Sequence, residues 1–262
     1  MAIGSQPRWT VQSADTQVGI DVGLRNYMLR IYNYMASALA LTGIVAYVFA
    51  NSGMYMSIAR TPAIWLVMLA PLGLVMVLSF GINRLSAAAT QAIFWLYAGL
   101  MGISLASVFL VFTGASVARV FFITAGTFAA MSLYGYTTRR DLSQLGSFLF
   151  MGLIGIVIAS LVNVFIGSTA LQFAISVIGV VIAMLVNIFL QSSMMQFVIC
   201  VIGVIVFTGL TAYDTQSVKE MYYEGDGHEI ASKKAVMGAL RLYLDFVNLF
   251  MMLIQLLGVR RD

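Results

Sequence analysis

Long apolar runs separated by short polar gaps form the dominant pattern along the chain. Membrane-spanning helices need about 20 apolar residues, and eight runs approach that length: 31–50, 63–81, 91–112, 117–136, 145–165, 171–189, 194–213 and 236–258. The strands of a membrane barrel would be about 10 residues long with alternating polarity, and the runs show no such alternation. We therefore predict an all-α, polytopic helical membrane bundle. It consists of a polar N-terminal tail (1–30), a transmembrane helical domain (31–258) and a short C-terminal tail (259–262).

Composition supports the membrane assignment and narrows the expected partners. Hydrophobic residues make up 61% of the chain and charged residues 9%, against about 25% charged residues in an ordinary soluble domain. The net charge of +4 comes from basic residues scattered at the ends of the runs, as the positive-inside rule predicts. We therefore expect the lipid bilayer, and no nucleic acid, as the partner.

Part of the membrane domain is a tandem repeat. Residues 158–181 (IASLVNVFIGSTALQFAISVIGVV) align without a gap to residues 182–205 (IAMLVNIFLQSSMMQFVICVIGVI), with 14 of 24 positions identical. If the extra copy adds a full pass, it reverses every helix that follows it. If it folds aside, the orientation of the last two helices is preserved. Basic residues favour a cytoplasmic N-terminus in both cases, and more strongly when one copy is left out.

The last two apolar runs carry carboxylates, which are costly inside a bilayer and usually face the bundle interior. Asp214 closes the seventh run. Asp245 lies within the eighth, on one helical stripe with Arg241, Asn248 and Gln255. Two interpretations of Asp245 remain open: an ion pair with Arg241 one turn earlier, or a proton or cation site. For Asp214 the structural alternative is a helix-end carboxylate in headgroup water.

Two carboxylates that meet in a bundle constrain each other. They cannot both ionise cheaply in a low dielectric, so they titrate as a unit. Such a pair can bind a hard cation such as Ca²⁺ through its oxygens or exchange it for protons. Outside the runs, the polar stretch 214–235 contains His228 among acidic residues, which we interpret as a solvated loop because one His is a weak ligand set. No P-loop, dinucleotide fingerprint or catalytic triad is present, so we expect no enzyme activity and no cofactor beyond a bound or transported Ca²⁺.

Two C-terminal motifs resemble a known family. VIGVIVFTGLTAYDTQ (201–216) and ALRLYLDFVNLFMMLIQLLG (239–258) resemble the signature regions of the Bax inhibitor-one family, also called the transmembrane Bax inhibitor motif family, in its bacterial YccA-like and YetJ-like branch. YGYTTRRDLSQLGSFLFMGLIG (134–155) is also similar to the bacterial members, and 81–105 more loosely. The likeness extends over roughly residues 25–258.

The resemblance implies a fold, a function and site residues. The fold would be a seven-helix bundle around a central last helix, in the bacterial inner membrane. The function would be a pH-sensitive calcium leak channel or exchanger, with Asp214 and Asp245 as the di-aspartyl sensor and ion site and Arg84 as a latch against Asp214. Arg241, which the family pattern lacks, and Asn248 would modulate the pair.

A second function is also implied. YccA-like members are associated with a membrane-embedded quality-control protease. The alternative is therefore a non-transporting modulator of such a protease, which would associate with it through the polar N-terminal tail.

Overall fold

The computed structural model describes residues 22–149, 151 and 193–261, and these residues are almost entirely helical. The predicted run 171–189 and the first copy of the repeat lie outside them. The second copy is described only from residue 193 onward. The helices are α1 (Val22–Asn51), α2 (Met54–Ala59), α3 (Ala63–Gly81), α4 (Ala87–Val111), α5 (Gly114–Thr137), α9 (Ser193–Glu220) and α10 (His228–Leu257), and residues 143–149 are also helical.

The predicted membrane bundle is confirmed for this part of the chain. Six described helices are long and apolar enough to cross a bilayer, namely α1, α3, α4, α5, the part of α9 from Cys200 and α10. The described residues form no strand, only an isolated bridge between Phe112 and Arg260. That bridge ties the C-terminal tail to the turn between α4 and α5, where the Thr113 N–H also donates to the Val259 carbonyl at 3.0 Å.

Several helices begin earlier than their apolar runs. The first starts at Val22, so residues 22–30 of the predicted tail are helical. The stretch 214–235, predicted to be a solvated loop, is mostly helical as well: α9 continues to Glu220 and α10 starts at His228. The first turns of α10 are polar but carry their own support, because Glu229 and Lys233 form an i,i+4 ion pair at 3.0 Å. Only residues 221–227 form the loop between the two helices.

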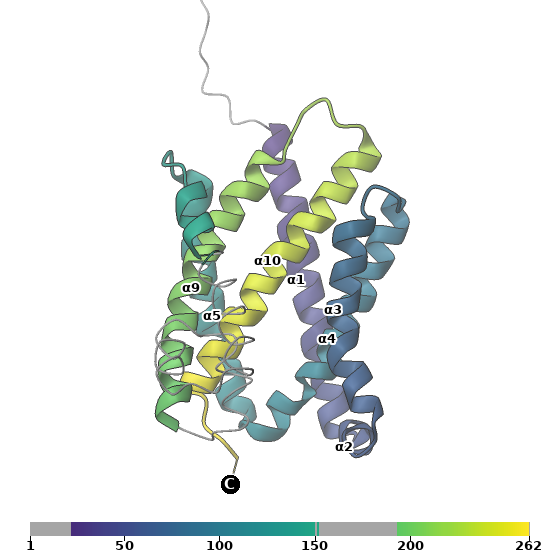
Figure 1. Ribbon diagram of the computed structural model, residues 1–262, viewed down its shortest axis with the longest axis vertical. Helices are drawn as coiled ribbons and strands as arrows, with labels where there is room; N and C mark the ends of the chain where they lie inside the picture. The colour runs from purple at the N-terminus through teal and green to yellow at the C-terminus, as the bar shows by residue number, and fades with distance from the viewer. Residues whose placement is uncertain (1–21, 150, 152–192, 262) are drawn as a thin grey trace, which may run out of the picture.

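The last helix is the centre of the bundle. In Figure 1, α10 runs diagonally across α1, with α9 and α5 on one side and α3 and α4 on the other. It packs against α9, α1, α5 and α4. Its residues contribute to both core clusters, for example Tyr243 in one and Leu249 in the other, both fully buried. This arrangement agrees with the family pattern of helices wrapped around the last one.

The direction of α9 answers part of the question that the repeat raised. The Lys219 ammonium donates to the Tyr136 carbonyl and the Gln216 amide to the Arg140 carbonyl, both at 2.8 Å. The end of α9 therefore lies beside the end of α5. Figure 1 places the start of α1 at this same end of the bundle. The last two helices thus have the directions that a seven-helix arrangement requires, and they are not inverted against α1, α3, α4 and α5.

Candidate functional site

The site lies where α9 and α10 face one another in the membrane part of the bundle. Asp214 is in α9, less than two turns before that helix ends, and Asp245 is near the middle of α10. Their two carboxyl groups are in hydrogen-bonding contact. The structure therefore brings together two residues that are 31 positions apart, as the resemblance implied.

The two carboxyl groups have different surroundings. Asp245 is 5% exposed, whereas the side chain of Asp214 is 19% exposed. The Oδ2 atom of Asp245 is buried and accepts no hydrogen bond from an N–H or O–H group of the described residues. A buried carboxylate oxygen without a donor is costly, so the pair needs a proton or a cation to be satisfied.

Arg241 is the cation of the site. Its guanidinium Nη1 lies 3.9 Å from Asp214 Oδ1 and donates to the Ser217 hydroxyl at 3.2 Å. The sequence left open an ion pair between Asp245 and Arg241, but among the described ion pairs the partner of Arg241 is Asp214 on the neighbouring helix. The side chain is 46% exposed, so solvent and salt screen the interaction.

A cavity of ≈ 480 Å³ adjoins the pair. Its volume is in the range of pockets that bind small ligands. Its titratable or charged lining residues, within the described part of the chain, are Asp214, Asp245, Arg241 and Tyr213. Gly146 allows residues 143–149 to approach, because a Cβ there would lie 2.4 Å from the Tyr213 ring.

The structure does not bring Arg84 to the pair. Arg84 is an exposed residue in the turn that follows α3. In Figure 1, α3 and α9 lie on opposite sides of α10. The role of Arg84 as a latch stays a prediction, and the position beside Asp214 is taken by Arg241 in this structure.

The polar stripe of α10 faces inward for most of its length. Asp245 is buried, and Asn248 and Gln255 are partly buried. Gln255 Oε1 accepts a weak bond from the Cys200 thiol of α9 at 3.6 Å. Arg241, at the start of the stripe, is exposed.

Ser217 is the member of the site that sequence reasoning missed. It follows Asp214 by three residues and therefore lies on the same face of α9. That spacing was the available signal, but a serine near a helix end is too common to stand out. In the described residues, no cluster of three or more His, Cys, Asp or Glu side chains could hold a metal ion.

Comparison with known proteins agrees with a helical membrane bundle. The protein is a polytopic α-helical membrane protein with two neighbouring acidic residues inside the membrane. One of them is buried in the central helix, and the other lies on the preceding helix. The chain matches the family described as "Inhibitor of apoptosis-promoting Bax1" over residues 24–182 and 176–262. The chain belongs to this family, the Bax inhibitor-1 family.

Bacterial relatives match nearly the whole chain. It is 45% identical over 252 residues to the inner membrane protein YbhL of Escherichia coli K12, covering 95% of this chain and 97% of the relative. It is 44% identical over 254 residues to the uncharacterized protein RP147 of Rickettsia prowazekii, covering 97% and 98%. A protein of Caulobacter vibrioides is 38% identical over 257 residues.

Proposed function

We propose that the protein is a pH-sensitive calcium leak channel or exchanger of the bacterial inner membrane, gated by the pair Asp214 and Asp245. The observation that carries the proposal is the contact between the two carboxyl groups, one of them buried in the central helix. Ionisable groups at such depth are costly and typically mark an ion or proton pathway. The name of the YbhL relative supports the inner-membrane location.

The chemistry of the pair favours a passing ion over a resident one. Ca²⁺ takes six to eight oxygen ligands, and two carboxyl groups offer four oxygens at most. The site therefore suits weak, transient binding of Ca²⁺ as cargo. A cation that enters the cavity can replace the proton held by the pair, because either one relieves the repulsion between the carboxylates.

Arg241 completes the proposed mechanism. Its guanidinium lies beside Asp214 and competes with an incoming cation for that carboxylate. Movement of Arg241 away from Asp214 would open the cavity to a cation. In this proposal Arg241 acts as the counter-charge beside Asp214, where the resemblance placed Arg84 as a latch.

Calcium flux into proteoliposomes containing an entrapped calcium indicator tests the proposal over a range of external pH. We expect pH-dependent flux for the native protein and pH-independent flux for both Asp214→Asn and Asp245→Asn. Asparagine keeps the size of each side chain and removes the titrating proton. Unchanged pH dependence in both variants would sink the mechanism, and no flux for the native protein would favour the protease-modulator alternative.

Asp141→Asn is the matched control. Asp141 is an exposed carboxyl in the turn after α5, outside the membrane-spanning helices. Hydrogen bonds from Ser143 lower the pKa of Asp141, so this group stays ionised over the tested range. Asparagine retains an oxygen that can accept from the Ser143 N–H, now at 2.8 Å from Asp141 Oδ1. We expect the flux of this variant and its pH dependence to match those of the native protein.

A further inference from the structure

A long apolar groove runs between α1 and α5. Both helices pack against α10 but make few direct contacts with each other. Two cavities of ≈ 650 and ≈ 310 Å³ fill this gap and share the lining residues Leu39, Phe121 and Phe246. Along α1 the combined lining extends from Arg25 to Ala46, about 32 Å at 1.5 Å per residue. That length equals the hydrocarbon thickness of a bilayer.

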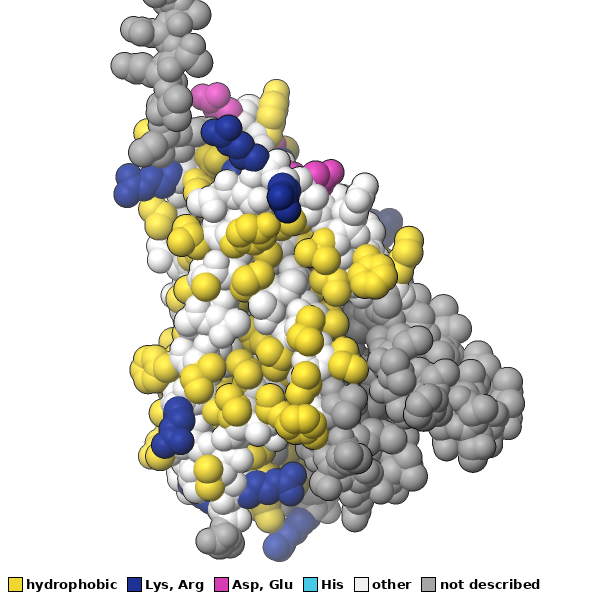
Figure 2. Space-filling view, turned by 90° about the vertical axis from the view of Figure 1, so that its left-hand side faces the viewer, with side chains coloured by type: hydrophobic (Ala, Val, Ile, Leu, Met, Phe, Trp, Pro, Cys, Tyr) yellow, Lys and Arg dark blue, Asp and Glu magenta, His cyan; other side chains and the backbone are white. Residues whose placement is uncertain are grey.

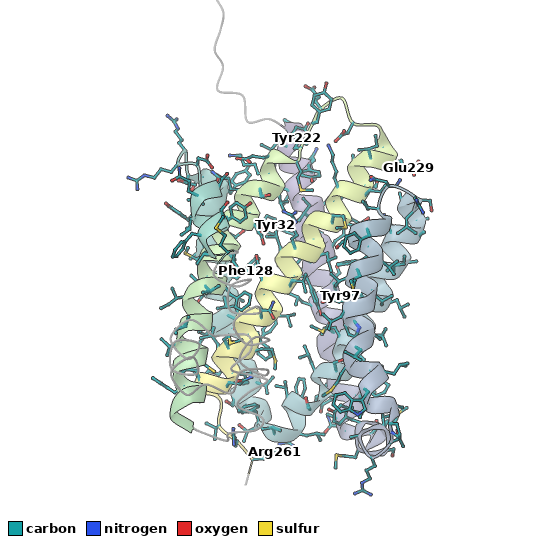
Figure 3. The ribbon with its side chains drawn as sticks, viewed as in Figure 1. Tyr32, Tyr97, Phe128, Tyr222, Glu229 and Arg261 are labelled. Carbon is teal, nitrogen blue, oxygen red and sulfur yellow. The ribbon has the colours of Figure 1, made fainter. Side chains whose placement is uncertain are left out.

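The walls of the larger cavity suit a hydrocarbon chain. Leu29, Leu39, Phe128 and Leu133 are among its lining residues. Two of its hydroxyl groups are already satisfied, because Tyr32 and Ser132 are hydrogen-bonded to each other at 2.5 Å and Ser132 is bonded to Thr215 at 3.0 Å. Figure 3 shows Tyr32 and Phe128 between α5 and α10 in this region. The interior of the groove therefore offers mainly apolar contact area.

One end of the groove carries positive charge. Arg25 lines the larger cavity in the first turn of α1 and is exposed. The described ion pairs do not include it. Arg139 and Arg140 follow α5 at the same end of the bundle, and both are exposed. No Lys or Arg is among the described lining residues of the smaller cavity.

We propose that the larger cavity is a binding site for one anionic phospholipid of the leaflet in which α1 begins. One acyl chain lies along the groove between α1 and α5, and the phosphate contacts Arg25. The charge at its end indicates the ligand, because an apolar groove that ends at a cation complements a lipid with an apolar tail and an anionic headgroup. A second membrane helix is about 10 Å wide with its side chains. The gap is too narrow for it, because Tyr32 of α1 reaches Ser132 of α5 across the gap. An apolar helix would also leave the charge of Arg25 unmatched.

The site touches the centre of the protein. Phe246 lines both cavities and follows Asp245 directly in α10. Its ring also packs on Phe121 and Phe128, with centroids 5.5 and 5.6 Å away. A bound acyl chain therefore contacts the residue next to the carboxyl pair. The lipid site itself does not depend on the proposed calcium flux.

Native mass spectrometry of the purified protein in mild detergent tests the proposal, with phosphatidylglycerol and phosphatidylcholine as probes. We expect tight binding of one phosphatidylglycerol and weaker binding of phosphatidylcholine. Removing the cation in Arg25→Gln should weaken phosphatidylglycerol binding about five-fold, the effect of one basic residue near an anionic headgroup. Arg60→Gln removes an exposed cation at the other end of the bundle and should leave binding unchanged.

Phenylalanine substitutions that fill the groove test the binding of the acyl chain independently of the charge of Arg25. Ala129 lines the larger cavity and is exposed, while its neighbour Ala130 is exposed but does not line it. Ala129→Phe should abolish the bound lipid, and Ala130→Phe should retain it. Ala36→Phe fills the groove from the opposite wall and should also abolish binding. Equal binding of the two lipids to the native protein, or retained phosphatidylglycerol in folded Ala129→Phe and Ala36→Phe, would overturn the proposal.

Discussion

Arg241 sets the charge balance around the carboxyl pair. It stands 3.9 Å from Asp214, is bonded to Ser217, and is about half exposed. A cation at this position favours the ionised form of a neighbouring carboxyl group. Its partial exposure limits that effect, because water and salt screen the charge.

Replacing Arg241 by glutamine should therefore move the midpoint of pH-dependent calcium flux to higher pH. Without the cation, the pair holds its proton more firmly, and the expected shift is up to about one pH unit after allowance for screening. The measurement is the flux titration in proteoliposomes. Arg241→Lys keeps the charge and should stay close to the native midpoint. A midpoint that moves to lower pH in Arg241→Gln would contradict the role assigned to this residue.

At the scale of elements, the approach of α9 to α5 fixes the position of Asp214. Gly135 permits this approach, because a Cβ built there would lie 2.1 Å from the Ala212 carbonyl oxygen. Ser132 and Thr215 are hydrogen-bonded one turn away, at 3.0 Å. Small residues at such crossings let helix backbones come close in lipid.

Gly135→Ala should separate the two helices and destabilise the fold. Overpacking of a close contact costs about 1–3 kcal/mol, which a lower unfolding temperature in detergent would report. Gly126→Ala is the matched control, since it lies in α5 with nothing within 4 Å of the added Cβ. Alanine favours a helix over glycine, so this control should be as stable as the native protein or slightly more so. Equal stability of the two variants would show that the contact at Gly135 is unimportant.

The helices also show what the sequence could and could not predict. Apolar runs located every described membrane helix, because burial in lipid demands such runs. They missed where α1 and α10 begin, because the first turns of these helices are polar and extend beyond the apolar part. The contact of Asp214 with Asp245 could not be derived from spacing, since the register between two helices depends on packing. It was expected only from the family resemblance.

At the scale of the whole molecule, the surface shows how the bundle sits in a membrane. In Figure 2, hydrophobic side chains cover the middle of the visible face, and Lys and Arg side chains appear toward both ends. The end where α1 begins carries more basic residues than the other end. Near the first lie Arg25, Arg30, Arg84, Arg139, Arg140, Lys219, Lys233 and Lys234; near the second lie Arg60, Arg119, Arg260 and Arg261.

This asymmetry predicts that the end where α1 begins faces the cytoplasm, because Lys and Arg near membrane helices are retained there. Single cysteines in a Cys200→Ala background test the prediction. Glu224 lies in the exposed loop between α9 and α10, and Ser57 is exposed in α2 at the opposite end. A membrane-impermeant maleimide should label Ser57→Cys in cells with a permeable outer membrane, and Glu224→Cys only after the inner membrane is disrupted. The reverse pattern would place Asp214 and Arg241 toward the periplasm, so that periplasmic pH, and not cytoplasmic pH, would act on the carboxyl pair.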